Sequence, residues 1–144
     1  MIAARSMTPS QRQSELIARY SILPDAHERL AALSTRRSRV APVPAEERTD
    51  EKRVPGCVSK VWMDAWMENG RCHLRMHAES PLVGALASVL CEIYDAATPE
   101  EIEATEPAIF QELGIEANLS PTRLNGLANL RARIVAFARE ADRQ

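Results

Sequence analysis

Few residues of this 144-residue chain could carry out chemistry, and a cysteine in a turn is the strongest candidate. Cys57 follows Pro55 and Gly56, a pair that constrains the backbone to a turn, so we expect the cysteine at a loop tip. Arg53 and Lys60 lie close by in the sequence, and a cationic setting favours the reactive thiolate form. Because free cysteine is also among the most buried residue types, an inert apolar residue is the alternative.

The other two cysteines have the setting of core residues. Cys72 lies on the apolar side of a predicted strand, and Cys91 lies within an apolar helix. The residue types also allow a zinc site made of Cys57, Cys72, His73 and His77. However, adjacent strand residues such as Cys72 and His73 point to opposite faces, and the close Cys-x2-Cys or His-x3-His spacing is missing. We therefore interpret Cys72 and Cys91 as core residues.

Arg123 is a second candidate because of its place at the start of a predicted helix. It follows Ser120, Pro121 and Thr122, and this order is typical of an N-cap serine with proline at the first helical position. The helix dipole favours acidic residues at this end. Arg123 is therefore either a solvated side chain or one that holds an anion.

Composition excludes several classes of protein. With 45% hydrophobic and 26% charged residues, the chain is typical of one globular domain, residues 1–144. The net charge of −2, from 18 basic and 20 acidic residues, argues against general nucleic-acid binding. No phosphate loop, dinucleotide turn or His-Glu-x-x-His pattern is present. No apolar run approaches a membrane span, and three cysteines are too few for a disulfide scaffold, so we expect no membrane association and a cytoplasmic location.

A β-hairpin is predicted in the middle of the chain. Residues 58–67 are rich in valine, tryptophan and methionine and are typical of a strand. Asn69-Gly70 is a strong hairpin-turn signal. From Cys72 to Met76, apolar residues alternate with basic ones, which predicts a second, half-buried antiparallel strand.

Helices are predicted on both sides of this hairpin. Apolar residues have helical spacing over 10–23, and Asp25 can cap a second helix. Residues 36–52, with charges and prolines, predict a long loop. Later helix starts are Ser80-Pro81, Thr98-Pro99 and Ser120-Pro121, with a short helix over 106–113 that ends at Gly114. The order predicts an α+β fold, in which a small antiparallel sheet is covered by helices.

Two segments resemble signatures of the SufE family, the sulfur-acceptor proteins of iron–sulfur cluster assembly. Residues 54–62, Val-Pro-Gly-Cys-Val-Ser-Lys-Val-Trp, resemble the signature Gly-Cys-x-Ser-x-Val-Trp. Residues 119–127, Leu-Ser-Pro-Thr-Arg-Leu-Asn-Gly-Leu, resemble Leu-[Ser/Thr]-Pro-[Ser/Thr]-Arg-x-x-Gly. Residues 94–102 are similar to the family's helix-to-helix junction, and residues 44–48 are a looser match. The resemblance covers about residues 25–140 and implies a single domain of SufE/IscU-like fold.

The resemblance implies a sulfur carrier with no cofactor of its own. In this family, a cysteine desulfurase of the SufS type uses pyridoxal phosphate (PLP) to strip sulfur from cysteine and holds it as a persulfide. The SufE-type protein accepts that sulfur and passes it to an iron–sulfur scaffold complex of the SufBCD type. Cys57 matches the persulfide acceptor, and Arg123 matches an arginine that stabilises the thiolate or persulfide. The chain is then a desulfurase activator rather than a stand-alone enzyme, and we also expect that it can form a homodimer.

Two other functions stay open from the sequence. A scaffold that binds metal or a nascent iron–sulfur cluster could use Cys57, Cys72 and Cys91. An adaptor protein with an inert Cys57 is the third hypothesis. The sequence also departs from the family where Glu51-Lys52-Arg53 replaces a usual asparagine, which bears on the choice of desulfurase more than on the chemistry.

Overall fold

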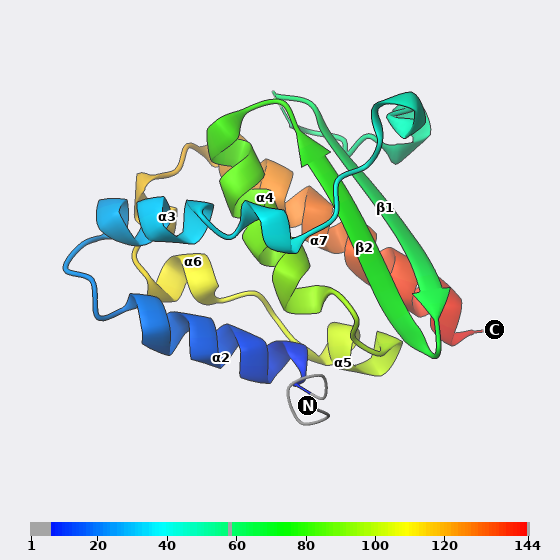
Figure 1. Cartoon of the computed structure of the whole chain (residues 1–144), viewed down its shortest axis with the longest axis horizontal. Coiled ribbons are helices and arrows are strands. Elements are labelled where there is room, and N and C mark those ends of the chain that lie inside the picture. The colour runs from blue at the N-terminus through cyan, green and yellow to red at the C-terminus, as the bar shows by residue number, and fades with distance from the viewer. Residues whose placement is uncertain (1–6, 58, 144) are drawn as a thin grey trace.

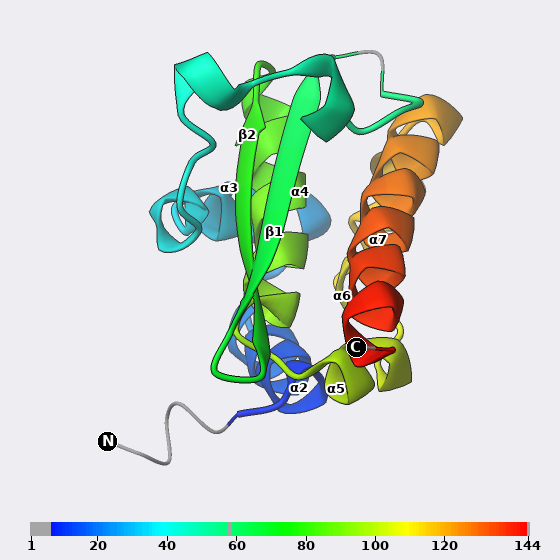
Figure 2. The same ribbon diagram turned by 90° about the vertical axis from the view of Figure 1, so that its right-hand side faces the viewer.

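A long two-stranded antiparallel hairpin forms one layer of the molecule, and helices cover one of its faces (Figure 1). The computed structural model describes residues 7–57 and 59–143. Strands β1 (Val61–Glu68) and β2 (Arg71–Ala78) lie against helix α4 (Pro81–Tyr94), and the longest helix, α7 (Pro121–Asp142), flanks β1 (Figure 2). The predicted α+β fold is therefore confirmed.

Local turn chemistry sets the register of the hairpin. Asn69 and Gly70 have φ angles of 54° and 77°, the left-handed pair that a two-residue turn of this kind requires. The register runs from Val61 opposite Ala78 to Glu68 opposite Arg71. In β2, buried and partly exposed residues alternate as the sequence predicts. Strand β1 begins at Val61, later than predicted, because the chain before it forms a loop; Val58 lies outside the described residues.

The outer edge of β2 is closed by irregular segments rather than by a third strand. The Cys72 N–H donates to the Ala97 carbonyl over 2.7 Å, and the Met76 N–H donates to the Ala41 carbonyl over 3.0 Å. Residues 36–52, predicted as a loop, contain three single-turn 3-10 helices at 37–39, 45–47 and 50–52. Val40 and Val43 are buried and hold this segment against the core. Because the segment is irregular, neither helical nor strand periodicity could predict that these two residues are buried.

Helix boundaries follow the capping residues. Asp25 caps α3 (Ala26–Ser34), and the Thr98 capping box opens α5 (Pro99–Ala104). Helix α2 (Pro9–Tyr20) ends three residues before the predicted end, and α6 (Ile109–Glu112) is shorter than predicted. Caps mark where helices start more sharply than apolar spacing marks where they end, because a cap is a specific hydrogen bond at one residue.

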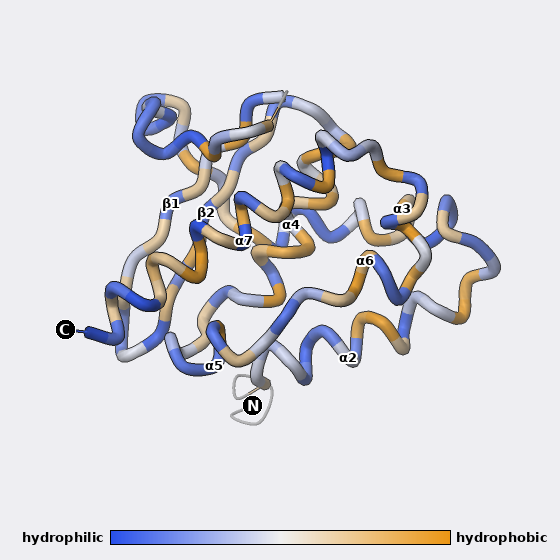
Figure 3. The backbone as a smooth tube through the Cα atoms, turned by 180° about the vertical axis from the view of Figure 1, so that it is seen from behind, coloured by the Kyte–Doolittle hydropathy of each residue, from blue (hydrophilic) through white to orange (hydrophobic). Residues whose placement is uncertain are grey.

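Helix α4 is the centre of the core. Ten of its residues are buried, and it contacts the hairpin as well as α2, α3 and α7. The C-terminal end of α7 is hydrophilic and lies at the periphery (Figure 3). Among the described residues, none of the helices combines the length and apolar character that crossing a bilayer requires.

Candidate functional site

Cys57 lies near the tip of a loop whose base is fixed to the sheet. The Val54 N–H donates to the Val61 carbonyl over 2.8 Å, and the side chain of Val54 is fully buried. On the return side, the Lys60 carbonyl accepts from the Glu79 N–H over 3.0 Å. The chain therefore leaves and rejoins the fold at anchored points, with the cysteine between them, as predicted.

Gly56 makes the turn before the cysteine possible. Its φ of +79° lies in the left-handed region, which other residues avoid. A Cβ atom at this position would also clash with Nδ2 of Asn129 on α7. The left-handed backbone conformation thus requires glycine here, and the Asn129 side chain would have to shift to make room for any other residue.

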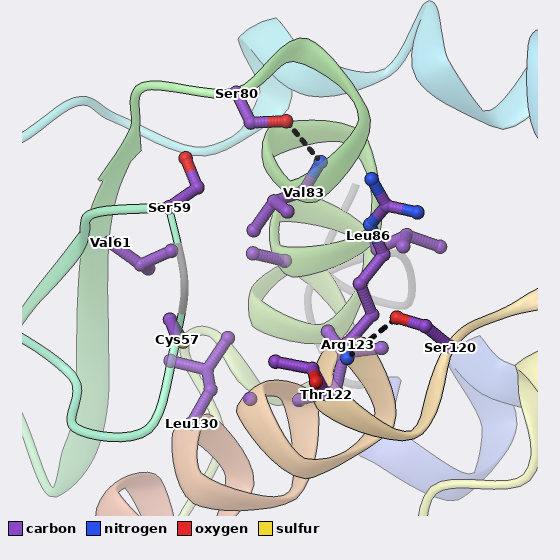
Figure 4. Close-up of a pocket in the computed structure, with 13 residues that line it drawn as sticks. Cys57, Ser59, Val61, Ser80, Val83, Leu86, Ser120, Thr122, Arg123 and Leu130 are labelled. Atoms are coloured by element: carbon purple, nitrogen blue, oxygen red, sulfur yellow. Dashed lines mark hydrogen bonds between the residues drawn. The ribbon is translucent and has the colours of Figure 1, made fainter.

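The thiol faces a pocket between three elements (Figure 4). The pocket has a volume of about 300 Å³ and lies between the Cys57 loop, the start of α4 and the first turns of α7. Apolar side chains of both helices and of β1 line it, together with hydroxyl groups and one arginine: Val61, Val83, Leu86, Leu127 and Leu130, with Ser59, Ser80, Ser120, Thr122 and Arg123. Cys57 is half-buried in this position.

The sulfur atom rests against the backbone of α7 at Gly126. A Cβ atom on Gly126 would lie 2.9 Å from Cys57 Sγ, which is well inside normal contact distance. Gly126 itself is buried. The glycine of the second sequence signature thus provides the space that the thiol occupies.

Burial dominates the electrostatics of the thiol in this conformation. Removal from water raises the pKa of Cys57, and the positive charge of Arg53 opposes this rise only in part. The expectation of a thiolate activated by nearby cations is therefore wrong for the resting loop. Arg53 acts in the predicted direction, but desolvation is the larger effect.

Arg123 lines the same pocket from the opposite wall. Its backbone N–H donates to Ser120 Oγ over 3.2 Å, and its exposed side chain extends toward α4 rather than toward Cys57 (Figure 4). The cation that lowers the pKa of Cys57 is Arg53, not Arg123. The structure thus brings the two predicted site residues to one pocket without pairing them.

Two helix N-termini meet at this pocket, a feature that sequence reasoning missed. Ser80 caps α4 by accepting from the Val83 N–H over 3.3 Å, and Ser120 caps α7 in the same way. Each N-terminus carries a partial positive charge and stabilises a nearby anion by about 0.3–1 kcal/mol. Both Ser-Pro starts are visible in the sequence, but their convergence depends on tertiary packing.

The other two cysteines are inaccessible. Cys72 and Cys91 are both fully buried. Burial raises the pKa of Cys72 to about 11 and, with a contribution from Asp95, that of Cys91 to about 12. Both are core residues, as interpreted from the sequence.

The residues of the alternative zinc site do not converge. His73 stacks on Trp66, and His77 packs beside Trp62, on the face of the hairpin opposite Cys72. Within residues 7–57 and 59–143, no three histidine, cysteine or acidic side chains gather closely enough to hold a metal ion. The cluster-scaffold hypothesis therefore has no ligand set in this part of the chain.

Side chains of α7 that sequence reasoning missed bind the loop backbone. Asn129 Nδ2 donates to the Pro55 carbonyl over 2.8 Å, and Arg133 Nη1 donates to the Arg53 carbonyl over 2.5 Å. Arg133 Nη2 also donates to the Glu51 carbonyl. The four-residue spacing of Asn129 and Arg133 places them on one helix face, but such a pattern usually marks a solvated face, so the sequence contains little signal for them.

Comparisons with known proteins agree with this geometry. The family model SufE, described as an Fe-S metabolism associated domain, matches residues 14–138. The sulfur acceptor protein CsdE of Escherichia coli (strain K12) is 34% identical over 100 residues, which cover 68% of this chain and 68% of CsdE. An uncharacterized SufE-like protein of Synechocystis sp. is 26% identical over 117 residues, covering 81% of this chain and 74% of that protein.

A solved structure supports the same assignment. The solution structure of a hypothetical protein from Thermus thermophilus superimposes with a TM-score of 0.76 at 26% identity, covering 96% of this chain and 99% of that one. The family model spans both signature segments, with Cys57 in the first and Arg123 in the second. The chain therefore belongs to the SufE family.

Proposed function

We propose that this chain accepts sulfur from a PLP-dependent cysteine desulfurase and relays it to an iron–sulfur cluster scaffold. One observation carries the proposal: the Cys57 sulfur lies on a loop tip, in a pocket where two helix N-termini meet. Family membership and the likeness to a protein named as a sulfur acceptor support it. The PLP belongs to the partner enzyme, and this chain contributes the acceptor thiol.

The transfer is a displacement at sulfur. The Cys57 thiolate attacks the outer sulfur of the donor persulfide, so a new S–S bond forms on Cys57 while the donor's S–S bond breaks. The donor cysteine leaves as a thiolate, and the proton lost by Cys57 goes to solvent or to that leaving group. Sulfur changes carrier without any external oxidant or reductant.

The pKa of Cys57 should differ between the resting conformation and the conformation that accepts sulfur. In the pocket, burial raises the pKa of Cys57, so the thiol stays protonated and unreactive near neutral pH. When the loop leaves the pocket, this desolvation is lost and the pKa falls toward that of an ordinary cysteine. Movement of the loop therefore activates the thiol as it delivers it to the donor.

After transfer, the pocket suits a persulfide. The terminal sulfur is anionic, and the N-termini of α4 and α7 favour a negative charge at this place. Arg123, on the wall of the same pocket, would stabilise this anion rather than the resting thiol. Leu127 and Leu130 line the pocket and would shield the bound sulfur from solvent reductants and oxidants.

The proposal is tested by desulfurase stimulation. Sulfide release from cysteine by a SufS-type desulfurase is measured with wild type, Cys57→Ser and the matched control Cys91→Ala. Wild type and Cys91→Ala should stimulate turnover, and Cys57→Ser should not. Full stimulation by a folded Cys57→Ser would disprove the assignment of the acceptor.

A further inference from the structure

The loop that carries Cys57 is held to α7 by side-chain donors. Asn129 donates to the Pro55 carbonyl, two residues before the cysteine, over 2.8 Å. Arg133 donates to the carbonyls of Arg53 and Glu51, on the segment that leads into the loop. All three bonds run from one helix to the backbone of one short segment, so they resist the same movement.

The three contact positions lie on one face of α7. Gly126, Asn129 and Arg133 are spaced by three and four residues, so the three positions follow one line along the helix. Gly126 leaves room for the sulfur, Asn129 binds the turn before it, and Arg133 binds the approach to the turn. The base of the loop needs none of these contacts, because Val54 pairs with β1 independently.

Arg133 binds backbone carbonyls rather than carboxylates, as Arg12 and Arg29 also do. Arg36, Arg75 and Arg139 pair with carboxylates. Among the described residues, no carboxylate lies within ion-pair distance of Arg133, and its donors bind carbonyl oxygens of the loop segment instead. A hydrogen bond from a charged donor is stronger than a neutral one, so this contact contributes more than that of Asn129.

We propose that Asn129 and Arg133 are positioning residues that latch the Cys57 loop closed and thereby set the fraction of molecules that present the thiol. The inference rests on the proposed function for its purpose, because an acceptor thiol must leave the pocket to reach a donor. The hydrogen bonds that form the latch lie within this chain, so the latch can be tested without a desulfurase. It acts through the loop backbone and touches no reacting atom.

The size of the effect follows from the bonds. Loss of one neutral hydrogen bond should raise the open population about 2–10-fold, and loss of the charged donor of Arg133 should raise it about 10-fold or more. When opening is fast and reversible, the alkylation rate of Cys57 is proportional to this open population. The alkylation rate of Cys57 therefore measures the open population directly, and no desulfurase is needed.

The experiment compares alkylation of Cys57 by iodoacetamide in the full chain, read by mass on the peptide that carries Cys57. The variants are Asn129→Ala, Arg133→Met and both together. Arg139→Met is the control, because Arg139 lies on the same helix but pairs with Glu103 at the surface. We expect rates about 2–10-fold and about 10-fold or more above wild type for the two single variants, and an unchanged rate for the control.

The pH profile is the second readout, because its midpoint reports how far the thiol is withdrawn from water. The charged group that acts on the thiol is Arg53 from the loop. Arg123 of α7 lines the same pocket but extends toward α4, and α4 contributes Val83, Leu86 and Ala87. Both arginines are retained in every variant. Because burial raises the pKa of Cys57, a more open loop should lower the pH at which alkylation is half-maximal.

The outcomes separate the latch from the proposed function. Faster alkylation of Cys57 with a lower midpoint pH, while Cys72 and Cys91 stay unreactive, supports the latch even if no variant takes up sulfur. Wild-type rates and midpoints in the double variant would overturn the latch even if sulfur transfer to Cys57 is normal. An equal rise in the alkylation of Cys72 and Cys91 would also overturn it, because the variants would then act by general unfolding.

Discussion

The loop tip and the core of this protein contain the same kind of residue in opposite settings. Cys57 is half-buried on a loop that is anchored at its base and by α7 side chains. Cys72 and Cys91 are fully buried, on β2 and α4, in the centre of the core. In all three, burial raises the thiol pKa, and it reaches about 11 and about 12 in the two core residues.

The cysteines differ in how much of the structure must open before the thiol reaches solvent. The core cysteines meet solvent only when the hairpin or α4 unfolds, which costs much of the free energy of folding. Cys57 meets solvent when a few hydrogen bonds between its loop and α7 break. Reactivity in this fold is therefore a matter of local opening, and a thiol can be protected at rest and still be available to a partner.

The largest expected effect is the contrast in alkylation between these two regions. In the folded chain, Cys57 should react about tenfold faster or more than Cys72 or Cys91, because opening of the core requires about 5 kcal/mol or more and opening of the loop breaks only a few hydrogen bonds. The rates are measured by mass on the separate peptides under native conditions. Comparable rates for Cys91 and Cys57 would show that the core opens as readily as the loop.

The next prediction concerns the pocket wall, which separates the Cys57 loop from the core. Leu130 is 1% exposed and lines the pocket, whereas its neighbour Leu127 is only partly buried. Leu130→Ala should lower the free energy of unfolding by about 2–5 kcal/mol, because it leaves a cavity in the core. Leu127→Ala is the matched control and should cost less. Denaturant unfolding measures both, and an equal cost would mean that the pocket is packed like the core.

Gly126→Ala should make Cys57 less buried and therefore less like the two core cysteines. The added methyl group would lie 2.9 Å from Cys57 Sγ, so the sulfur must move out of its seat. Less burial lowers the thiol pKa, so alkylation should reach half its maximum at a lower pH than in wild type. The sign is decisive here: a midpoint that stays or rises would show that the sulfur does not rest against Gly126.

The smallest expected effect separates the two arginines near the thiol. Arg53 lowers the pKa of resting Cys57, so Arg53→Met should raise the pH midpoint of alkylation. Arg123→Ala should leave this midpoint in place but slow sulfur uptake, because we assign Arg123 to the persulfide. The two variants are compared by alkylation profiles and by single-turnover sulfur transfer. A shifted midpoint in Arg123→Ala, with normal uptake, would reverse these roles.

Signals that act over a few residues were sufficient to predict much of the fold. The caps at Asp25, Ser80, Thr98 and Ser120 each satisfy a backbone N–H within three residues, and Asn69-Gly70 fixes the hairpin turn. Such contacts depend on the local sequence alone, so they can be predicted from it. The same local patterns placed Cys57 on a loop and Cys72 and Cys91 in the core.

The remaining features depend on residues that are far apart in the sequence. Asn129 meets Pro55 across 74 positions, and Arg133 meets Arg53 across 80. Nothing local distinguishes these side chains from an ordinary solvated helix face. The pKa of Cys57 was expected in the wrong direction for the same reason, since nearby cations can be read from the sequence but burial against Gly126 cannot.

The most direct test of the account locates the transferred sulfur. The chain is incubated with a cysteine desulfurase and cysteine, free thiols and persulfides are then blocked, and peptide mass spectrometry finds the residue that gained one sulfur atom. We predict the added sulfur on Cys57, with none on Cys72 or Cys91 while the chain stays folded. Added sulfur on Cys91, or none on Cys57 beside an active desulfurase, would contradict it.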